Sequence, residues 1–387
     1  MRRSTRAAIA AALFIALQSP LALPQQAQGV SKTEIRIGTI QDLSGPLALY
    51  GKNIRNGLQM RLEEANEAGG VHGRKFKLLV EDSGYDPKKG MLAGTKLVSS
   101  EKVFAVVGTI GTPVMQATMP MILEKGVFHL FPLAAARESF EPLHPLKFAF
   151  FAPYYDAMRA GVKHMVREKG YKRVGLLVQD DDFGSELAAG AETGLKEMNM
   201  TVAEKVTYKR GATDFSSQVQ RLKAANVDFV VLGTALRETV GSMVEARKLG
   251  WNVDMMCSQA STTSIVARLG GKAVEGLYGT PQFPPDPANA QYARWVGDYK
   301  KRFGPEFDTS AVAGYIAGDL LIRGLDNAGP NLTLATMTAG LERVKTTRDF
   351  FETSGFQFSK TSHIGSRNVR LAQIRAGKWT VISDYLE

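Results

Sequence analysis

The sequence predicts an α/β protein with two Rossmann-like lobes, each built on a parallel doubly wound sheet, joined by a multi-strand hinge. Short apolar runs typical of buried strands alternate with helix-length segments from residue 34 to residue 131, and the alternation restarts after residue 153. Proline-punctuated extended segments at 143–153 and from 276 separate the runs, which indicates that the chain crosses between lobes more than once. We therefore expect a ligand between the lobes, at the carboxyl ends of both sheets.

The first run of elements accounts for one lobe. Strands are expected at 34–40, 75–81, 103–107 and 127–131. Helices are expected at 53–69, at 87–100 and from residue 112 onward, the first of them ended by Gly69 and Gly70. Because a helix follows each strand, neighbouring strands of this lobe should run parallel.

The second run accounts for the other lobe, and a last segment is expected to return to the first. Strands are expected at 173–178, 202–208, 229–232 and 254–257, with helices at 154–169, 185–198, 215–225 and 238–249. The last segment is expected to form helices at 288–303, 310–326 and 334–344 and strands at 356–358 and 369–374. The predicted units are a signal peptide at 1–29, an N-terminal lobe at 30–152 plus 281–369, and a C-terminal lobe at 153–280 plus 370–387.

The turn after the third expected strand is the strongest candidate for a binding site. Gly108 to Gly111 form a tight turn, and Thr112-Pro113 are typical of an N-cap followed by proline at the first helical position. A helix N-terminus at the carboxyl end of a parallel strand presents free N–H groups to an anion. The turn lacks the spacing and the lysine of a phosphate-binding loop, so a carboxylate fits better. The alternative is a plain strand-to-helix turn.

The first 29 residues predict a secretory signal peptide. Arg2, Arg3 and Arg6 precede an apolar segment at 7–17, and small residues follow near residue 29. The apolar segment is too short to span a bilayer. The single cysteine, Cys257, excludes both a lipid-anchored N-terminal cysteine and an intramolecular disulfide. We expect a protein of the periplasm that is not lipid-anchored.

Several function classes find no support in the sequence. The formal charge is +10, but the basic residues are scattered without the clustered stripe of a nucleic-acid site, so no nucleic acid is expected. The five histidines have no metal-ligand spacing, and no nucleophile elbow is present. We expect neither a metal nor a cofactor, and we expect a binding protein rather than an enzyme.

A series of short motifs resembles one known family. The motifs are SGP at 44–46, YG at 50–51, EANEAGG at 64–70 followed by VHG at 71–73, the segment 82–87, TDFS at 213–216, RLK at 221–223 and VDF at 227–229. In this order and spacing the chain resembles the periplasmic leucine/isoleucine/valine-binding family, the type I solute-binding proteins of ABC importers. The resemblance covers nearly the whole mature chain. It implies a type I periplasmic binding protein fold, a monomer, and two partners in the inner membrane, the importer's permease and its ATPase.

The resemblance also implies a set of ligand-binding residues. The ligand carboxylate would meet the N–H and hydroxyl of Thr112, and backbone groups of Leu133 and Ala135 would add contacts. Tyr50 would cover the ligand from the first lobe, and Phe183 would close over it from the second. The full expected set is Tyr50, Gly111, Thr112, Pro113, Leu133, Ala134, Ala135, Tyr154, Tyr155, Phe183, Ala235 and Gln259.

Departures from the family's pattern bear on the ligand. Amino-acid binders of the family place a hydroxyl at the position of Ala135 and a glutamate at that of Gln259, because a buried ammonium needs an acceptor and an opposite charge. They also bound the pocket with a tyrosine near the position of Ala235, so alanine there leaves room for a bulkier ligand. The family's disulfide, where present, joins the positions of Tyr85 and Gly111, neither of which is cysteine here. The missing disulfide leaves the anion-binding turn free to differ in shape. Ala135, Ala235 and Gln259 favour the aromatic-acid-binding branch, with phenylpyruvate, a hydroxycinnamate or a benzoate derivative as ligand.

Two alternatives stay open at this point. The first is a binder of branched-chain or other hydrophobic amino acids whose ammonium is held by other groups, such as Tyr154 or Tyr155 with Asp156. The second is a ligand sensor that reports to a membrane receptor or regulator.

Overall fold

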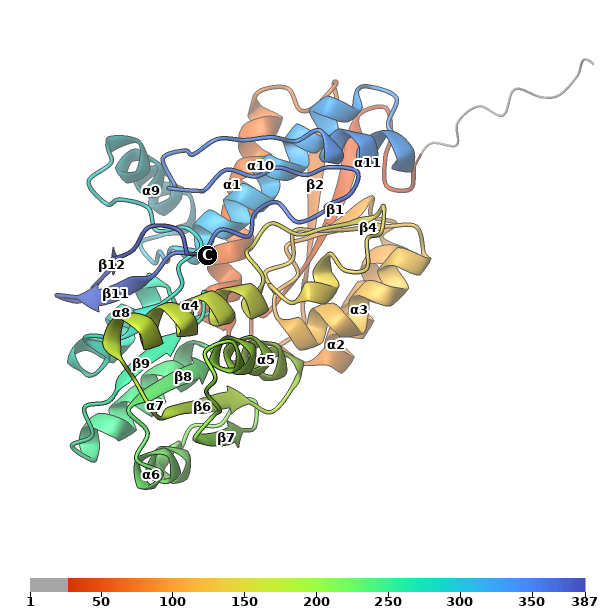
Figure 1. The fold of residues 1–387 in the computed structure, drawn as a ribbon. Helices are drawn as coiled ribbons and strands as arrows, with labels where there is room; N and C mark the ends of the chain where they lie inside the picture. Colours follow the sequence, from red (N-terminus) through yellow and green to blue (C-terminus); the bar gives the residue numbers. More distant parts are fainter. Residues whose placement is uncertain (1–26, 387) are drawn as a thin grey trace, which may run out of the picture.

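The computed structural model describes residues 27–386, so the predicted signal peptide at 1–29 lies almost wholly outside the described residues. The described chain forms two α/β lobes, each with helices packed against a largely parallel sheet (Figure 1). The predicted fold class is therefore confirmed. None of the helices within residues 27–386 is long and apolar enough to cross a membrane.

The first lobe is built on a five-stranded parallel sheet with the order β2-β1-β3-β4-β5. Its strands are β1 (Glu34–Gln41), β2 (Lys75–Asp82), β3 (Ala105–Val107), β4 (Phe128–Leu130) and β5 (Lys147–Phe148). Its early helices are α1 (Ala48–Glu67), α2 (Pro87–Thr95) continued by the π-helical turn η1 (Lys96–Ser100), α3 (Thr112–Glu124) and the 3₁₀ turn η2 (Arg137–Ser139). β3 and β4 are buried throughout, as expected of central parallel strands.

The second lobe is built on a seven-stranded sheet with the order β12-β11-β10-β9-β8-β6-β7. Its strands are β6 (Val174–Gln179), β7 (Glu204–Tyr208), β8 (Phe229–Gly233), β9 (Asp254–Cys257), β10 (Tyr278–Gly279), β11 (Ala372–Arg375) and β12 (Lys378–Val381). Its helices are α4 (Tyr154–Lys169), α5 (Asp182–Lys196), α6 (Ser216–Ala224), α7 (Leu236–Lys248), α8 (Ser264–Gly270) and the 3₁₀ turn η3 (Gly271–Val274). The strands from β6 to β10 are parallel, and β11 and β12 are added antiparallel.

The late helices pack against the first lobe. They are α9 (Ala290–Phe303), α10 (Ser310–Ala328) and α11 (Leu334–Glu342). α10 lies beside α1 (Figure 1), where Arg61 and Asp319 form an ion pair at 3.0 Å. The Tyr299 hydroxyl of α9 donates to Asn53 Oδ1 of α1 at 2.8 Å. The chain thus returns to the first lobe after building most of the second, although the residue boundaries assigned to the two lobes stay a prediction.

The extended segments that cross between the lobes lie side by side. The first follows β5, and its Ala149 N–H donates to the His363 carbonyl of the last crossing at 2.9 Å. The second follows β10, and Gln282 Oε1 accepts the Ala152 N–H at 2.9 Å. These bonds fix the carboxyl end of the first sheet opposite that of the second.

The C-terminal region differs most from the sequence prediction. No strand forms at 356–358, where Gln357 makes only an isolated bridge to Lys345. The expected strand at 369–374 begins at Ala372 instead, and β12, which was not predicted, pairs with it. Ala376 and Gly377 join the two with φ of 50° and 73°, the geometry of a tight hairpin turn. Ala-Gly is a weak signal for such a turn, so the hairpin was missed.

Candidate ligand-binding site

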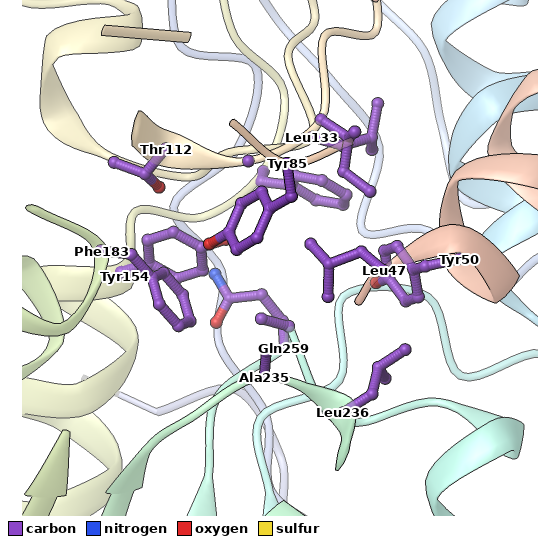
Figure 2. Close-up of a pocket in the computed structure, with 14 residues that line it drawn as sticks. Leu47, Tyr50, Tyr85, Thr112, Leu133, Tyr154, Phe183, Ala235, Leu236 and Gln259 are labelled. Carbon is purple, nitrogen blue, oxygen red and sulfur yellow. The ribbon is translucent and has the colours of Figure 1, made fainter. Parts of the chain in front are cut away.

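A cavity of about 40 Å³ lies between the lobes, where the carboxyl ends of both sheets face each other (Figure 2). It is lined by Leu47, Tyr50, Tyr85, Ile110, Gly111, Thr112, Leu133, Phe151, Tyr154, Phe183, Ala235, Leu236, Gln259 and Ala260. A benzene-sized molecule needs about 150 Å³. A ligand with an aromatic ring therefore enters only when the lobes separate or the lining side chains move.

The start of α3 supplies polar groups that the rest of the described chain leaves unpaired. The helix begins at Thr112, as predicted, but the N-cap is Gly111 with φ of 90°, and no side chain caps the helix. Thr112 as N-cap is therefore wrong. Its side chain is 1% exposed, and its Oγ1 has no hydrogen-bond partner within residues 27–386. Its N–H likewise makes no bond there. A buried hydroxyl and a helix N-terminal N–H thus face the cavity.

Tyr85 forms the wall of the cavity next to this turn. A Cβ added to Gly111 would lie 2.3 Å from Tyr85 Cε2, so only glycine lets the ring lie against the turn. The Tyr85 hydroxyl accepts a hydrogen bond from Gln179 Nε2 of the second lobe at 3.2 Å. Burial, followed by the charge of Asp181, raises the pKa of Tyr85, so the phenol stays protonated.

Aromatic rings make up much of the remaining wall. Tyr50 comes from α1, Phe151 from the first crossing, Tyr154 from the first turn of α4 and Phe183 from the first turn of α5. The Tyr154 and Phe183 rings meet edge to face, with centroids 5.2 Å apart. Burial raises the pKa of Tyr154, and burial with the charge of Asp308 raises that of Tyr50. The cavity is therefore walled by neutral aromatic side chains.

The cavity wall contains no charged side chain among its fourteen described residues. The one amide, Gln259, is engaged with the crossing segments. Its Nε2 donates to the Ala152 carbonyl at 2.7 Å, and its Oε1 accepts from Thr280 Oγ1 at 3.4 Å. A ligand cation would find no opposite charge here, whereas a carboxylate would find neutral donors.

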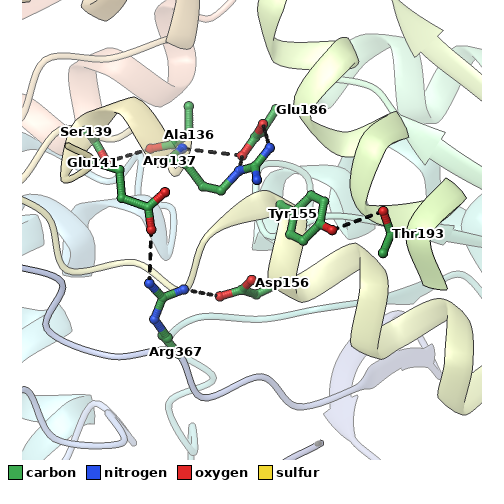
Figure 3. A network of polar contacts seen from close by, with 9 residues as sticks. All are labelled: Ala136, Arg137, Ser139, Glu141, Tyr155, Asp156, Glu186, Thr193 and Arg367. Atoms are coloured by element: carbon green, nitrogen blue, oxygen red, sulfur yellow. Dashed lines mark hydrogen bonds and ion pairs between the residues drawn. The ribbon is translucent and has the colours of Figure 1, made fainter. Parts of the chain in front are cut away.

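Contacts between the lobes surround the cavity. Opposite the hinge, Arg210 Nη1 of the second lobe donates to the Tyr85 carbonyl at 2.9 Å. On the hinge side, Arg137 forms a two-pronged ion pair with Glu186 of α5, with Nε–Oε1 at 2.8 Å and Nη2–Oε2 at 3.1 Å (Figure 3). The lobes therefore touch on both sides of the cavity.

The family of the chain follows from comparison with known proteins. The model of a family described as periplasmic binding protein matches residues 34–378. The chain belongs to this family. Members of the family are solute-binding proteins.

A curated relative and two solved structures are each similar to this chain over most of the chain's length. The chain is 25% identical to the Leu/Ile/Val-binding protein of Escherichia coli (strain K12) over 244 residues, 63% of this chain and 66% of that protein. A fatty acid ABC transporter substrate-binding protein from Thermomonospora curvata is similar with a TM-score of 0.84 and 23% identity, covering 94% of each chain. A solute-binding protein from R. palustris in complex with benzoate has a TM-score of 0.81 and 20% identity, covering 92% of this chain and 97% of that one.

Eight of the twelve predicted site residues line the cavity of this family member. They are Tyr50, Gly111, Thr112, Leu133, Tyr154, Phe183, Ala235 and Gln259. Leu133 contributes its side chain, because its N–H donates to the Thr109 carbonyl at 2.9 Å. Their role in binding stays a prediction.

The other four predicted residues, Pro113, Ala134, Ala135 and Tyr155, do not line the cavity. Successive residues of a helix point about 100° apart, so Tyr154 faces the cavity while Tyr155 faces α5, where its hydroxyl donates to Thr193 Oγ1 at 3.0 Å (Figure 3). The Ala135 carbonyl accepts the Tyr154 N–H at 2.8 Å. Ala134 packs under α3 in a cluster with Met115 and Met119.

Six lining residues were not predicted: Leu47, Tyr85, Ile110, Phe151, Leu236 and Ala260. Ile110, Leu236 and Ala260 are chain neighbours of predicted residues, so a wider window around each motif would have found them. Tyr85 could have been predicted more directly, because the family's disulfide, where present, joins the positions of Tyr85 and Gly111. That pairing implies a contact, which the structure bears out without any sulfur.

Proposed function

We propose that the chain is the solute-binding protein of an ABC importer and that its ligand is a small aromatic acid, such as phenylpyruvate, a hydroxycinnamate or a benzoate derivative. The observation that carries this proposal is the unpaired Thr112 hydroxyl and N–H, which face a cavity walled by aromatic side chains. A carboxylate that accepts both bonds would satisfy two buried donors at once.

The absence of charge in the described cavity wall supports an acid without an ammonium. An ammonium buried against Tyr154, Phe183 and Ala235 would lose its hydration and gain no carboxylate in return. Amino-acid binders of the family place a tyrosine near the position of Ala235, and the smaller alanine leaves space for a bulkier ligand. The benzoate complex of the R. palustris neighbour supports the same ligand class by analogy of fold.

The principal alternative is a branched-chain or other hydrophobic amino acid. It is favoured by the sequence similarity to the Leu/Ile/Val-binding protein of Escherichia coli. In this alternative the ammonium would have to be held by carbonyl groups or by a carboxylate that reaches the cavity only in another conformation. A ligand sensor would use the same cavity and differs only in its partner.

The proposal includes a location, partners and a mechanism. The protein acts as a monomer in the periplasm and does no chemistry on its ligand. The ligand contacts both lobes only in the closed form, so its binding energy shifts the population toward that form. The permease, which works with its ATPase in the inner membrane, then recognises the closed protein.

Thermal unfolding of the chain from residue 30 onward tests the ligand class. The ligands are used in matched pairs: phenylpyruvate with L-phenylalanine, 4-methyl-2-oxopentanoate with L-leucine, and benzoate with benzamide, beside 4-hydroxycinnamate. A ligand at a hundred times its Kd stabilises the fold by about 2.7 kcal/mol, which raises Tm by several degrees. We expect the aromatic acids to raise Tm. L-Phenylalanine, L-leucine and benzamide should leave Tm unchanged. A shift with L-leucine or L-phenylalanine alone would favour the amino-acid alternative.

A further inference from the structure

The backbone of Tyr85 is held in a conformation that bulky residues avoid. Its φ is 58°, in the left-handed region, and its side chain is 4% exposed. Such strain is destabilising and is concentrated at ligand clamps and active sites. Arg210 stabilises the conformation from the second lobe, with Nη1 bonded to the Tyr85 carbonyl and the guanidinium 5.2 Å from the ring centroid. These contacts keep the ring at the cavity wall in spite of the strain.

The hydrogen bonds around Gln179 determine whether the Tyr85 hydroxyl donates to Gln179 or accepts from it. Gln179 Nε2 lies 2.6 Å from Asp181 Oδ2, and because a carboxylate only accepts, the amide nitrogen must face it. Gln179 Oε1 then accepts from the Tyr208 hydroxyl at 3.2 Å, while Tyr208 itself accepts the Ala235 N–H at 3.4 Å. The bond between Gln179 and Tyr85 therefore has the amide as donor.

This assignment leaves the Tyr85 proton free. The oxygen accepts from Gln179, and no acceptor for its proton is found within residues 27–386. The hydroxyl points into the space between Thr112 and the rings of Tyr154 and Phe183 (Figure 2). A phenol that is buried and protonated needs an acceptor, because an unused buried donor is destabilising.

We infer that Tyr85 donates its hydroxyl proton to the ligand carboxylate and, with the N–H and hydroxyl of Thr112, selects an acid over a neutral or cationic ligand. The inference rests on the proposed function and adds a specificity-determining residue to it. The three groups are neutral donors, two from the turn at α3 and one from the strained segment after β2. They suit a single carboxylate, whose charge is stabilised by hydrogen bonds rather than by a counterion.

The test compares the affinities of the wild-type chain and the Tyr85→Phe variant for benzoate and 4-hydroxycinnamate by calorimetric titration. Phenylalanine keeps the ring against Gly111 and removes only the hydroxyl. Loss of a hydrogen bond to a charged group should raise Kd by about 10- to 100-fold. Tyr155→Phe is the matched control, because Tyr155 lies outside the cavity and bonds Thr193, and its Kd should stay within about twofold of wild type.

A second variant, Tyr208→Phe, tests whether Asp181 alone fixes the orientation of the amide. Asp181 still accepts from the Gln179 amide nitrogen in this variant, so the Tyr85 proton stays free for the ligand and Kd should stay within about threefold of wild type. Equal affinity of wild type and Tyr85→Phe for both acids would overturn the role of Tyr85 and leave the proposed function standing. Failure of the wild-type chain to bind any acid of the panel would overturn both.

Discussion

Thr112 is a single residue whose buried polar groups are left free to bind a ligand. Its hydroxyl and N–H are buried at the start of α3 with no partner in the described chain, although unpaired buried polar groups are destabilising. Pro113, the next residue, has no N–H to compete for the same acceptor. The unpaired hydroxyl and N–H of Thr112 can therefore donate two hydrogen bonds to oxygen atoms of a ligand.

Replacing Thr112 with valine should separate binding from stability. Thr112→Val keeps the side-chain shape and removes a hydroxyl that bonds nothing in the described chain, so Tm without ligand should be unchanged or slightly higher. The Kd for the acid ligand should rise by about 10- to 100-fold, because a bond to a charged group is lost. Thermal unfolding and calorimetric titration measure the two effects.

Thr112→Ser is the control for this substitution. Serine keeps the hydroxyl, so its Kd should stay within about threefold of wild type. If valine and serine gave the same affinity, the Thr112 hydroxyl would have no part in binding.

At the scale of elements, the turn from β3 into α3 and the segment after β2 form one unit. Gly111, with φ of 90°, lets the Tyr85 ring approach the start of the helix. The carboxyl ends of β2, β1 and β3 lie side by side in the sheet, which brings the two segments together. The polar groups of the cavity thus depend on a contact between two turns rather than on either turn alone.

Gly111→Ala should destabilise the first lobe and weaken binding together. The new methyl group would overlap Tyr85 Cε2 at 2.3 Å, in addition to the strain of a positive φ. Gly69→Ala is the matched control, since Gly69 has φ of 100° and no atom within 4 Å of the added Cβ. We expect thermal unfolding to show a loss about 1–3 kcal/mol larger at Gly111 than at Gly69.

The contact with Tyr85 can be isolated by a double substitution. In a Tyr85→Ala background, Gly111→Ala should cost no more than Gly69→Ala, because the overlapping ring is gone. If Gly111→Ala lowered the stability of the Tyr85→Ala variant as much as that of wild type, backbone strain alone would explain its effect.

At the scale of the whole molecule, the closed form is stabilised by contacts at both sides of the cavity. Arg210 bonds Tyr85 at the edge opposite the hinge, and Arg137 pairs with Glu186 on the other side. Arg367 of the last crossing also pairs with Asp156 of α4 at 2.6 Å (Figure 3). Since the cavity measures about 40 Å³, either the lobes separate or the lining side chains move before an aromatic ligand enters.

Arg210→Met should shift the chain toward the open form. Methionine keeps part of the stem and removes the bond to the Tyr85 carbonyl, so the closed form loses stability that the open form never had. We expect a Kd about threefold to tenfold higher and a larger radius of gyration without ligand, measured by calorimetric titration and small-angle X-ray scattering. Arg221→Met is the control, because Arg221 pairs with Glu204 within the second lobe. Identical scattering from both variants and wild type would contradict the role of Arg210 in closure.

Local sequence patterns determined much of this protein. The alternation of apolar runs and amphipathic segments specifies the parallel part of each sheet, because buried strands and helices differ in period and length. The helix start at Thr112 follows from glycine and proline in the turn, whose backbone preferences act within a few residues. The short motifs then indicated the family and eight residues of the cavity wall.

Tertiary structure decided what depends on segments distant in the chain. Tyr85 enters the cavity because Arg210 of the other lobe bonds its strained backbone and Gln179 of that lobe bonds its hydroxyl. Tyr154, and not Tyr155, faces the cavity because of the rotation of α4 against α5. The hydrogen-bond donors left free for a ligand are those that distant segments do not occupy. Local propensity cannot count them, because each depends on which partner the folded chain brings within about 3 Å.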